Sequence, residues 1–161
     1  MIKRCINISV VLISFDKILS KIIKSEPGIK KVMLVDRTGL IIASVSKFSY
    51  FPIDIDEIGA TASAIFAASE DQGTNLRLGG LKLITSEFSE GKMFVASCGS
   101  NGVISLISGP NINLAWIRLI LKRSVKELKG KLDRFFNGDN EYTEPHRKLR
   151  STSATPFVNF K

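Results

Sequence analysis

The chain has 161 residues, of which 44% are hydrophobic and 24% are charged, a composition typical of a soluble globular domain. Its two cysteines and one histidine exclude a disulfide framework and a cysteine–histidine metal cluster. The net charge of +8 is concentrated near the two ends: residues 1–30 hold six Lys or Arg against two Asp or Glu, and residues 114–136 hold seven against two. A surface this basic can attract nucleic acid, anionic lipid or an acidic partner.

The first residues, MIKRCINISVVLIS, combine a basic pair with a short apolar run. No small-residue cleavage site follows, and the run is too short to cross a bilayer. We therefore favour an N-terminal extension over residues 1–14, or a start codon upstream of the domain, over a signal peptide. From Phe15 to Ile23 the apolar residues recur with a period of 3.6, which predicts an amphipathic helix that ends at Pro27-Gly28.

Two β-branched runs, 32–35 and 40–45, flank the sequence DRTG and predict a β-hairpin. Both runs are apolar on both faces, so we expect the hairpin to lie centrally in a sheet that is covered on two sides. A second helix should begin at Asp54, with Glu57 completing a capping box. It should reach at least Gln72, and Gly79-Gly80 would end it.

Three further strand-like runs, 81–88, 92–98 and 103–108, are separated by short glycine-bearing turns and predict an antiparallel meander. Asn111 or Asn113 should cap a last helix. From residue 137 the chain becomes polar and loses periodicity, so we expect a mostly disordered tail over 137–161 and a domain over 15–136. The order α-β-β-α-β-β-β-α predicts an α+β fold with one five-stranded, largely antiparallel sheet and helices on both faces.

The sequence contains no pattern that indicates catalysis. It has no phosphate-binding loop, and the single histidine, His146, lies in the tail. Cys98 sits in an apolar strand, where a buried structural thiol is the favoured interpretation. The carboxylates Asp54, Asp56 and Glu57 are explained by capping a helix rather than by a metal or acid–base site. We therefore expect no enzyme activity, no cofactor and no metal.

The second predicted helix poses a different question, because residues 58–69 carry no charge. One stripe should face the sheet, namely Ile58, Ala62, Ile65, Phe66 and Ser69. The remaining positions would face solvent, yet they are small and uncharged: Ala60, Thr61, Ser63, Ala64, Ala67 and Ala68. Alanine is a good helix former and needs no partner for that reason alone. An uncharged outer face nevertheless indicates burial, and a second copy of the same helix across a two-fold axis is the simplest cover.

Three stretches resemble the Roadblock (dynein light-chain) family: GIKKVMLVDRTGLIIAS (28–44), the alanine-rich helix 54–72 and NINLAWIRLILKRSVKEL (111–128). The resemblance covers about residues 15–136, and longin-like and profilin-like folds share parts of the pattern. It implies a noncatalytic dimer, formed with itself or with a Roadblock paralogue, whose central helices pair and whose third strands join.

The resemblance further implies a cytoplasmic scaffold or regulator of small Ras-like GTPases, in polarity, motility, trafficking or nutrient signalling. The surface that meets the GTPase in the family lies around the paired central helices. Carried over to this chain, it points to Glu57, Glu70, Asp71 and Asn75.

The alternative function uses the basic residues of the first and last helices, which are Lys17, Lys21, Lys24, Arg118, Lys122, Lys126 and Lys129. If the two helices share one side of the sheet, these residues would form a module that binds a membrane surface or nucleic acid, although a solvated face is the simpler explanation. Aromatic residues do not interleave with these charges, which disfavours nucleic acid. A peripheral contact with anionic lipid is compatible with the GTPase function.

Overall fold

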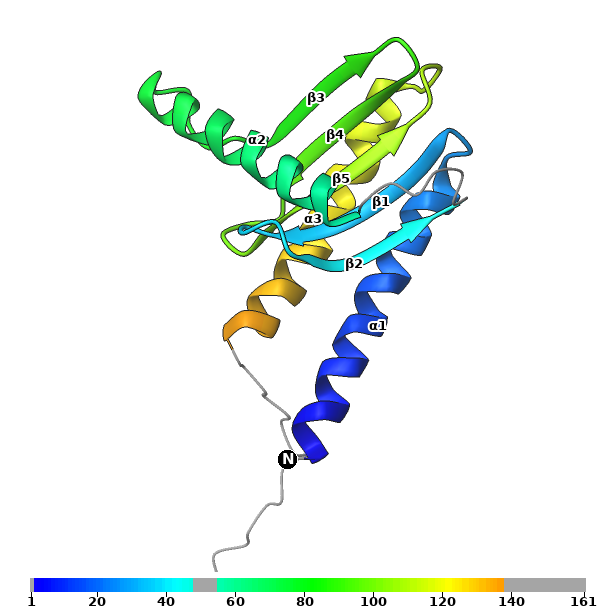
Figure 1. The fold of residues 1–161 in the computed structure, drawn as a ribbon, viewed down its shortest axis with the longest axis vertical. Coiled ribbons are helices and arrows are strands. Elements are labelled where there is room, and N and C mark those ends of the chain that lie inside the picture. Colours follow the sequence, from blue (N-terminus) through cyan, green and yellow to red (C-terminus); the bar gives the residue numbers. More distant parts are fainter. Residues whose placement is uncertain (1, 48–54, 138–161) are drawn as a thin grey trace, which may run out of the picture.

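The computed structural model describes residues 2–47 and 55–137. In chain order, its helices and strands are α1 (Ile2–Ser25), β1 (Ile29–Asp36), β2 (Ile41–Ser46), α2 (Ile55–Asn75), β3 (Leu83–Phe88), β4 (Gly91–Ser97), β5 (Gly102–Ser108) and α3 (Leu114–Asn137). The strands form one five-stranded sheet in the order β2-β1-β5-β4-β3, and all neighbours are antiparallel. Helices α1 and α3 cover one side and α2 crosses the other (Figure 1). The predicted α+β fold is confirmed.

Two apolar cores hold these layers together. The larger core lies between the sheet and the pair α1 and α3, and its largest side chains include Phe15, Leu19, Phe94, Leu106, Ile117 and Leu121. The smaller core lies under α2 and consists of Val35, Ala62, Phe66, Val95 and Val103. Alternate residues of one strand serve opposite cores, because successive side chains of a strand point to opposite faces. The α2 side therefore rests on a much smaller buried cluster than the α1–α3 side.

The structure corrects two expectations about the first half of the chain. Helix α1 begins at Ile2 rather than near Phe15, because no helix-breaking residue separates the first apolar run from the amphipathic stretch. The predicted hairpin is not central: β1 is an inner strand, but β2 forms one edge of the sheet. The apolar side chains of β2 are covered on one face by α1 packing across them, a long-range contact that local sequence does not reveal.

Helix α2 ends earlier than the glycine pair suggested. Arg77 adopts a left-handed backbone conformation with φ of 55°, and the Leu78 amide donates to the Gly73 carbonyl at 2.8 Å. This is a Schellman-type ending with arginine at the position that glycine usually takes. At the start of α3, Asn113 is the cap, since its Oδ1 accepts a hydrogen bond from the Trp116 amide at 3.1 Å.

Some expectations fall on residues that the structure does not describe. The proposed cap at Asp54, and the tail beyond Asn137 with its single histidine, lie outside the described residues. Within the described ranges, no helix combines the length and the apolar character needed to cross a membrane.

Candidate functional site: the outer face of the central helix

The start of α2 touches the β1–β2 turn through backbone. Gly39 has φ of +97°, and a Cβ added to it would lie 2.7 Å from the Cα of Ala60. In return, a Cβ added to Gly59 would lie 2.7 Å from the Gly39 carbonyl oxygen. Real Cβ atoms do not approach other atoms this closely, so both positions require glycine. The turn itself is closed by Asp36, whose Oδ1 accepts from the Thr38 amide at 2.8 Å and from the Leu40 amide at 2.9 Å.

Arg37, in the same turn, contacts the C-terminal half of α2. Its Nη1 donates to Oε2 of Glu70 at 2.8 Å, and its Nη2 donates to the Gly99 carbonyl at 2.7 Å. The guanidinium also lies 5.2 Å from the ring centroid of Phe66, within range of a cation–π interaction. One side chain thus joins the β1–β2 turn, α2 and the β4–β5 turn. Arg37 was not among the residues predicted from the sequence; its charge, in a turn between two apolar runs, was the available signal.

The structure corrects the predicted faces of Ser63 and Ile65 on α2, and it gives Glu70 an intramolecular partner. Ser63 is not available to a second chain, because it is 5% exposed and its hydroxyl donates to the Arg37 carbonyl at 2.7 Å. Ile65 does not face the sheet, since it is 36% exposed on the outer side. Glu70 is half-buried and its carboxylate is already paired with Arg37. Ser63 and Ile65 lie at opposite edges of the stripe that was predicted to face the sheet. The buried stripe is rotated about the helix axis toward Ser63, so Ser63 is buried and Ile65 is exposed.

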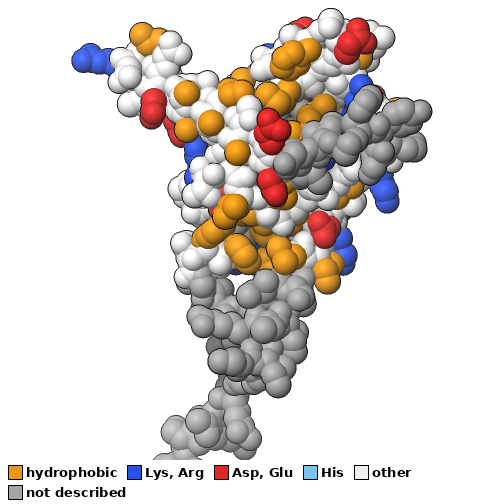
Figure 2. Space-filling model, in the orientation of Figure 1, with side chains coloured by type: hydrophobic (Ala, Val, Ile, Leu, Met, Phe, Trp, Pro, Cys, Tyr) orange, Lys and Arg blue, Asp and Glu red, His pale blue; other side chains and the backbone are white. Residues whose placement is uncertain are grey.

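The other residues expected on the outer face of α2 are exposed, and they are Ala60, Thr61, Ala64, Ala67 and Ala68. Glu57, Asp71 and Asn75 are exposed as well, the first near the start of the helix and the other two near its end. Figure 2 shows hydrophobic side chains gathered along α2 and over the strands beside it, with acidic side chains at intervals. The result is a small-residue face with acidic residues toward its two ends.

The sheet beside α2 is only partly covered. Helix α2 packs over β1, β5 and β2, and its C-terminal part extends away from the sheet (Figure 1). Ile84 of β3 and Met93 of β4 remain partly exposed on this side, and Phe88 at the end of edge strand β3 is exposed. An open groove of about 620 Å³ lies where α2 passes into β3, with the exposed Leu76 and Leu78 in its lining. Apolar surface therefore continues from α2 onto β3.

Cys98 has the properties of a structural thiol. It is fully buried, as predicted, and burial raises its pKa from 9.0 to about 12. At neutral pH the group is a protonated thiol, which is a poor nucleophile. Across the described part of the chain, no three histidine, cysteine or acidic side chains are grouped so that they could hold a metal ion.

A family model described as the Roadblock/LC7 domain matches residues 15–108. The chain belongs to the Roadblock/LC7 family. The uncharacterized proteins MJ1340 and MJ0310 of Methanocaldococcus jannaschii are each 33% identical to it over 114 residues, which span 71% of this chain and 96% of each relative. The match to the Roadblock/LC7 model takes in α2 and the whole sheet, and it ends before α3 begins.

Solved structures share the same fold. The gliding protein MglB of Thermus thermophilus superimposes with a TM-score of 0.67 at 16% identity, covering 73% of this chain and 87% of that one. MglB of Myxococcus xanthus gives 0.67 at 20% identity, covering 78% and 96%. A Roadblock/LC7 domain from Streptomyces avermitilis gives 0.66 at 19% identity, covering 73% and 96%. At these identities the likeness establishes the Roadblock/LC7 architecture of this chain.

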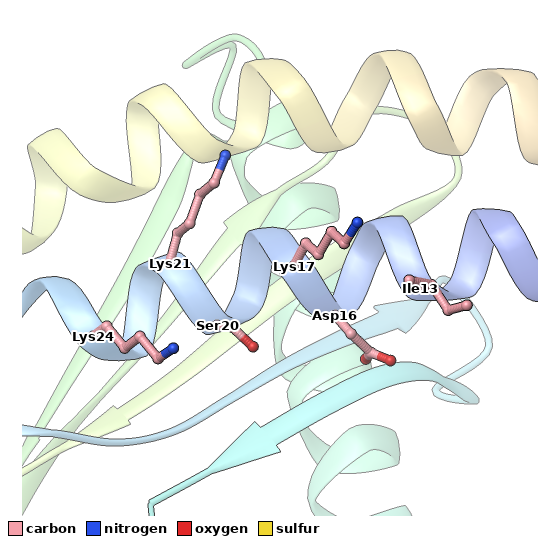
Figure 3. Close-up of a pocket in the computed structure, with 6 residues that line it drawn as sticks. All are labelled: Ile13, Asp16, Lys17, Ser20, Lys21 and Lys24. Atoms are coloured by element: carbon pink, nitrogen blue, oxygen red, sulfur yellow. The ribbon is translucent and has the colours of Figure 1, made fainter.

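On the other side of this Roadblock/LC7 domain, α1 and α3 lie next to each other, as the alternative function required. We define the basic face as Lys17, Lys21, Lys24, Arg118, Lys122, Lys126 and Lys129, all of which are exposed. Arg118 lies at the border of this face, because it also lines the groove where α2 passes into β3. Lys17 and Lys21 extend toward α3, whereas Asp16 points away from it (Figure 3). An open groove of about 400 Å³ follows this part of α1. Arg123 and Arg134 are also exposed on α3, although they were not among the basic residues predicted from the sequence.

Proposed function

We propose that this protein is a noncatalytic, dimeric scaffold or regulator that binds a small Ras-like GTPase. One observation carries the proposal: the outer face of α2 is built from small uncharged residues and stays exposed beside an edge strand. Membership of the Roadblock/LC7 family supports it, since the resemblance implies this arrangement and this role. The partner copy is the same chain or a Roadblock paralogue.

The geometry favours a two-fold dimer through α2 and β3. Ala60, Thr61 and Ala64 leave room for a second helix axis to approach, and the adjoining apolar side chains of β3 and β4 extend the contact area. Edge strand β3 presents unpaired backbone groups that a second β3 could use. One of the similar solved structures is described as MglB with a tetrameric arrangement, so self-assembly occurs on this fold in that protein.

For the GTPase, we propose a docking surface at the ends of the paired helices. Glu57, Asp71 and Asn75 are the residues that we assign to it. Glu70 stays a candidate for this surface, but we leave it out of the test because reversing its charge would also break the ion pair with Arg37. Exposed acidic residues should steer toward basic residues on the partner and speed association in a salt-dependent way.

The test is affinity capture of small GTPases from a lysate of the source cell, with GDP and a non-hydrolysable GTP analogue in parallel. We expect capture by the wild-type protein and weaker capture by D71K, with the dimer intact. E90K, which reverses an exposed acidic residue in the β3–β4 turn, is the matched control and should capture normally. Tight binding of GTP or GDP by the isolated protein, measured by calorimetry, would contradict the proposal.

A further inference from the structure

The proposed GTPase-binding function gives no role to the positive charges of the basic face. Helix α3 carries seven basic residues against two acidic ones, and α2 carries four acidic residues and no basic one. The two helices lie on opposite sides of the sheet. The domain is therefore polarised, with its positive side away from the α2 face.

Within the described residues, no ion pair joins the basic face to an acidic side chain, although Asp16 and Glu127 lie exposed on the same two helices. The two ion pairs found there, Arg37–Glu70 and Lys92–Glu87, both lie elsewhere. Among the acidic residues of α1 and α3, Asp133 accepts a hydrogen bond from Asn101 at 2.8 Å and so faces the β4–β5 turn. Lysine and arginine side chains without an intramolecular counter-ion are available to an external anionic surface.

Large apolar side chains lie exposed among these charges. Trp116 is 39% exposed and Leu119 is 38% exposed, one turn apart on the outer side of α3. Ile13 is exposed on α1 and lines the same groove as Lys17 and Lys21 (Figure 3). Tryptophan and aliphatic side chains flanked by cations match the boundary between lipid headgroups and acyl chains.

We propose that the basic face binds the surface of a bilayer that contains anionic lipid. Lysine and arginine would contact the headgroups, while Trp116, Leu119 and Ile13 enter the interfacial layer. A nucleic acid would account for the charges, but it would gain nothing from the exposed leucine and isoleucine. In the bound orientation α2 points away from the membrane, which leaves its outer face open to protein partners.

The proposal is tested by vesicle flotation with the full-length protein. We expect binding to vesicles of phosphatidylcholine mixed with phosphatidylserine, little binding to phosphatidylcholine alone, and release as salt is raised. Each lysine near an anionic membrane contributes roughly a fivefold change in affinity, so K122E/K126E should weaken binding by at least about tenfold.

A matched control separates this face from net charge. K30E/K82E removes the same charge from exposed lysines outside α1 and α3 and should bind as the wild type does. W116S/L119S should keep the salt-sensitive part of the binding and lose the part that persists at high salt. Melting curves verify that every variant is folded.

Three outcomes would overturn the proposal. The first is equal binding to vesicles with and without phosphatidylserine, or to neither. The second is an equal loss in K122E/K126E and K30E/K82E. The third is tighter binding to duplex DNA or to single-stranded RNA than to the anionic vesicles at the same salt concentration, which would assign the face to nucleic acid.

Discussion

Gly39 and Arg37 show how a four-residue turn positions a helix that begins well beyond it in the sequence. Gly39 allows backbone contact between the turn and α2, and Arg37 extends from the same turn to Glu70 and to the Gly99 carbonyl. The turn was predictable from the sequence DRTG. Its partners were not, because Glu70 lies 33 residues away from Arg37 and Gly99 lies 62 residues away. The local sequence pattern identifies the turn, whereas the residues that Arg37 contacts can be identified only from the fold.

Replacing Gly39 with alanine should destabilise the domain by at least about 2 kcal/mol, because a Cβ there meets the α2 backbone and the left-handed φ disfavours an L-residue. The matched control is G80A, since a Cβ at Gly80 meets no atom within 4 Å. That variant should change the free energy of unfolding by less than about 1 kcal/mol. The change is stabilising if its main effect is to reduce the conformational freedom of the unfolded chain. Urea denaturation measures both. Equal losses in the two variants would refute the close contact between the turn and α2.

Cys98 predicts a dependence of stability on alkaline pH. Its folded pKa of about 12 is above the unfolded value of 9.0, so the unfolded chain releases the thiol proton first. The stability due to the protonated thiol is therefore complete below pH 9.0 and is lost as the pH rises toward 12. The slope should be about 1.4 kcal/mol per pH unit in that window. C98A should lack this component when the free energies of unfolding of the two proteins are compared, and an identical slope in both would contradict it.

At the scale of elements, the sequence predicted every helix and strand that the structure describes, and the errors concern edges and faces. The apolar stripe of α3 is regular, and the buried residues of that helix follow it, namely Ile117, Ile120, Leu121, Leu128 and Leu132. On α2, small residues surround the helix, so the pattern could not decide between Ser63 and Ile65 for the buried side. The order of the strands in the sheet could not be predicted from the sequence either, because the edge strand β2 and the inner strand β1 have similar apolar runs.

The same small residues of α2 give the prediction for self-association. A64R places an arginine where a second helix would pack, and an unpaired charge in such an interface should raise the dimer dissociation constant by at least about tenfold. Light scattering should then report a monomer. N111R adds the same charge to an exposed loop residue before α3 and should stay dimeric. A wild-type protein that is monomeric at high micromolar concentration would exclude the α2 dimer.

At the scale of the whole molecule, the sheet separates two surfaces of opposite character. Small and acidic residues occupy the α2 side, and lysine and arginine occupy the α1–α3 side. The family match covers the first surface completely, whereas the second depends on α3, which follows the matched residues. A partner-binding surface on one side and a membrane-binding surface on the other would place a GTPase near a bilayer without either surface blocking the other.

This separation predicts that the two surfaces act independently. A64R should abolish dimer formation and lower GTPase capture, yet each monomer keeps an intact basic face for anionic vesicles. K122E/K126E should lose vesicle binding and keep both the dimer and the capture. Ala64 and the pair Lys122 and Lys126 belong to helices that pack on opposite sides of the sheet, against different apolar clusters. We therefore expect the combined variant to change the free energies of dimerisation and of vesicle binding by the sum of the single-variant changes, within about 0.5 kcal/mol. Vesicle flotation, light scattering and capture, measured on the same four proteins, test this additivity. A loss of GTPase capture in K122E/K126E alone would show instead that the basic face is itself the protein-binding surface.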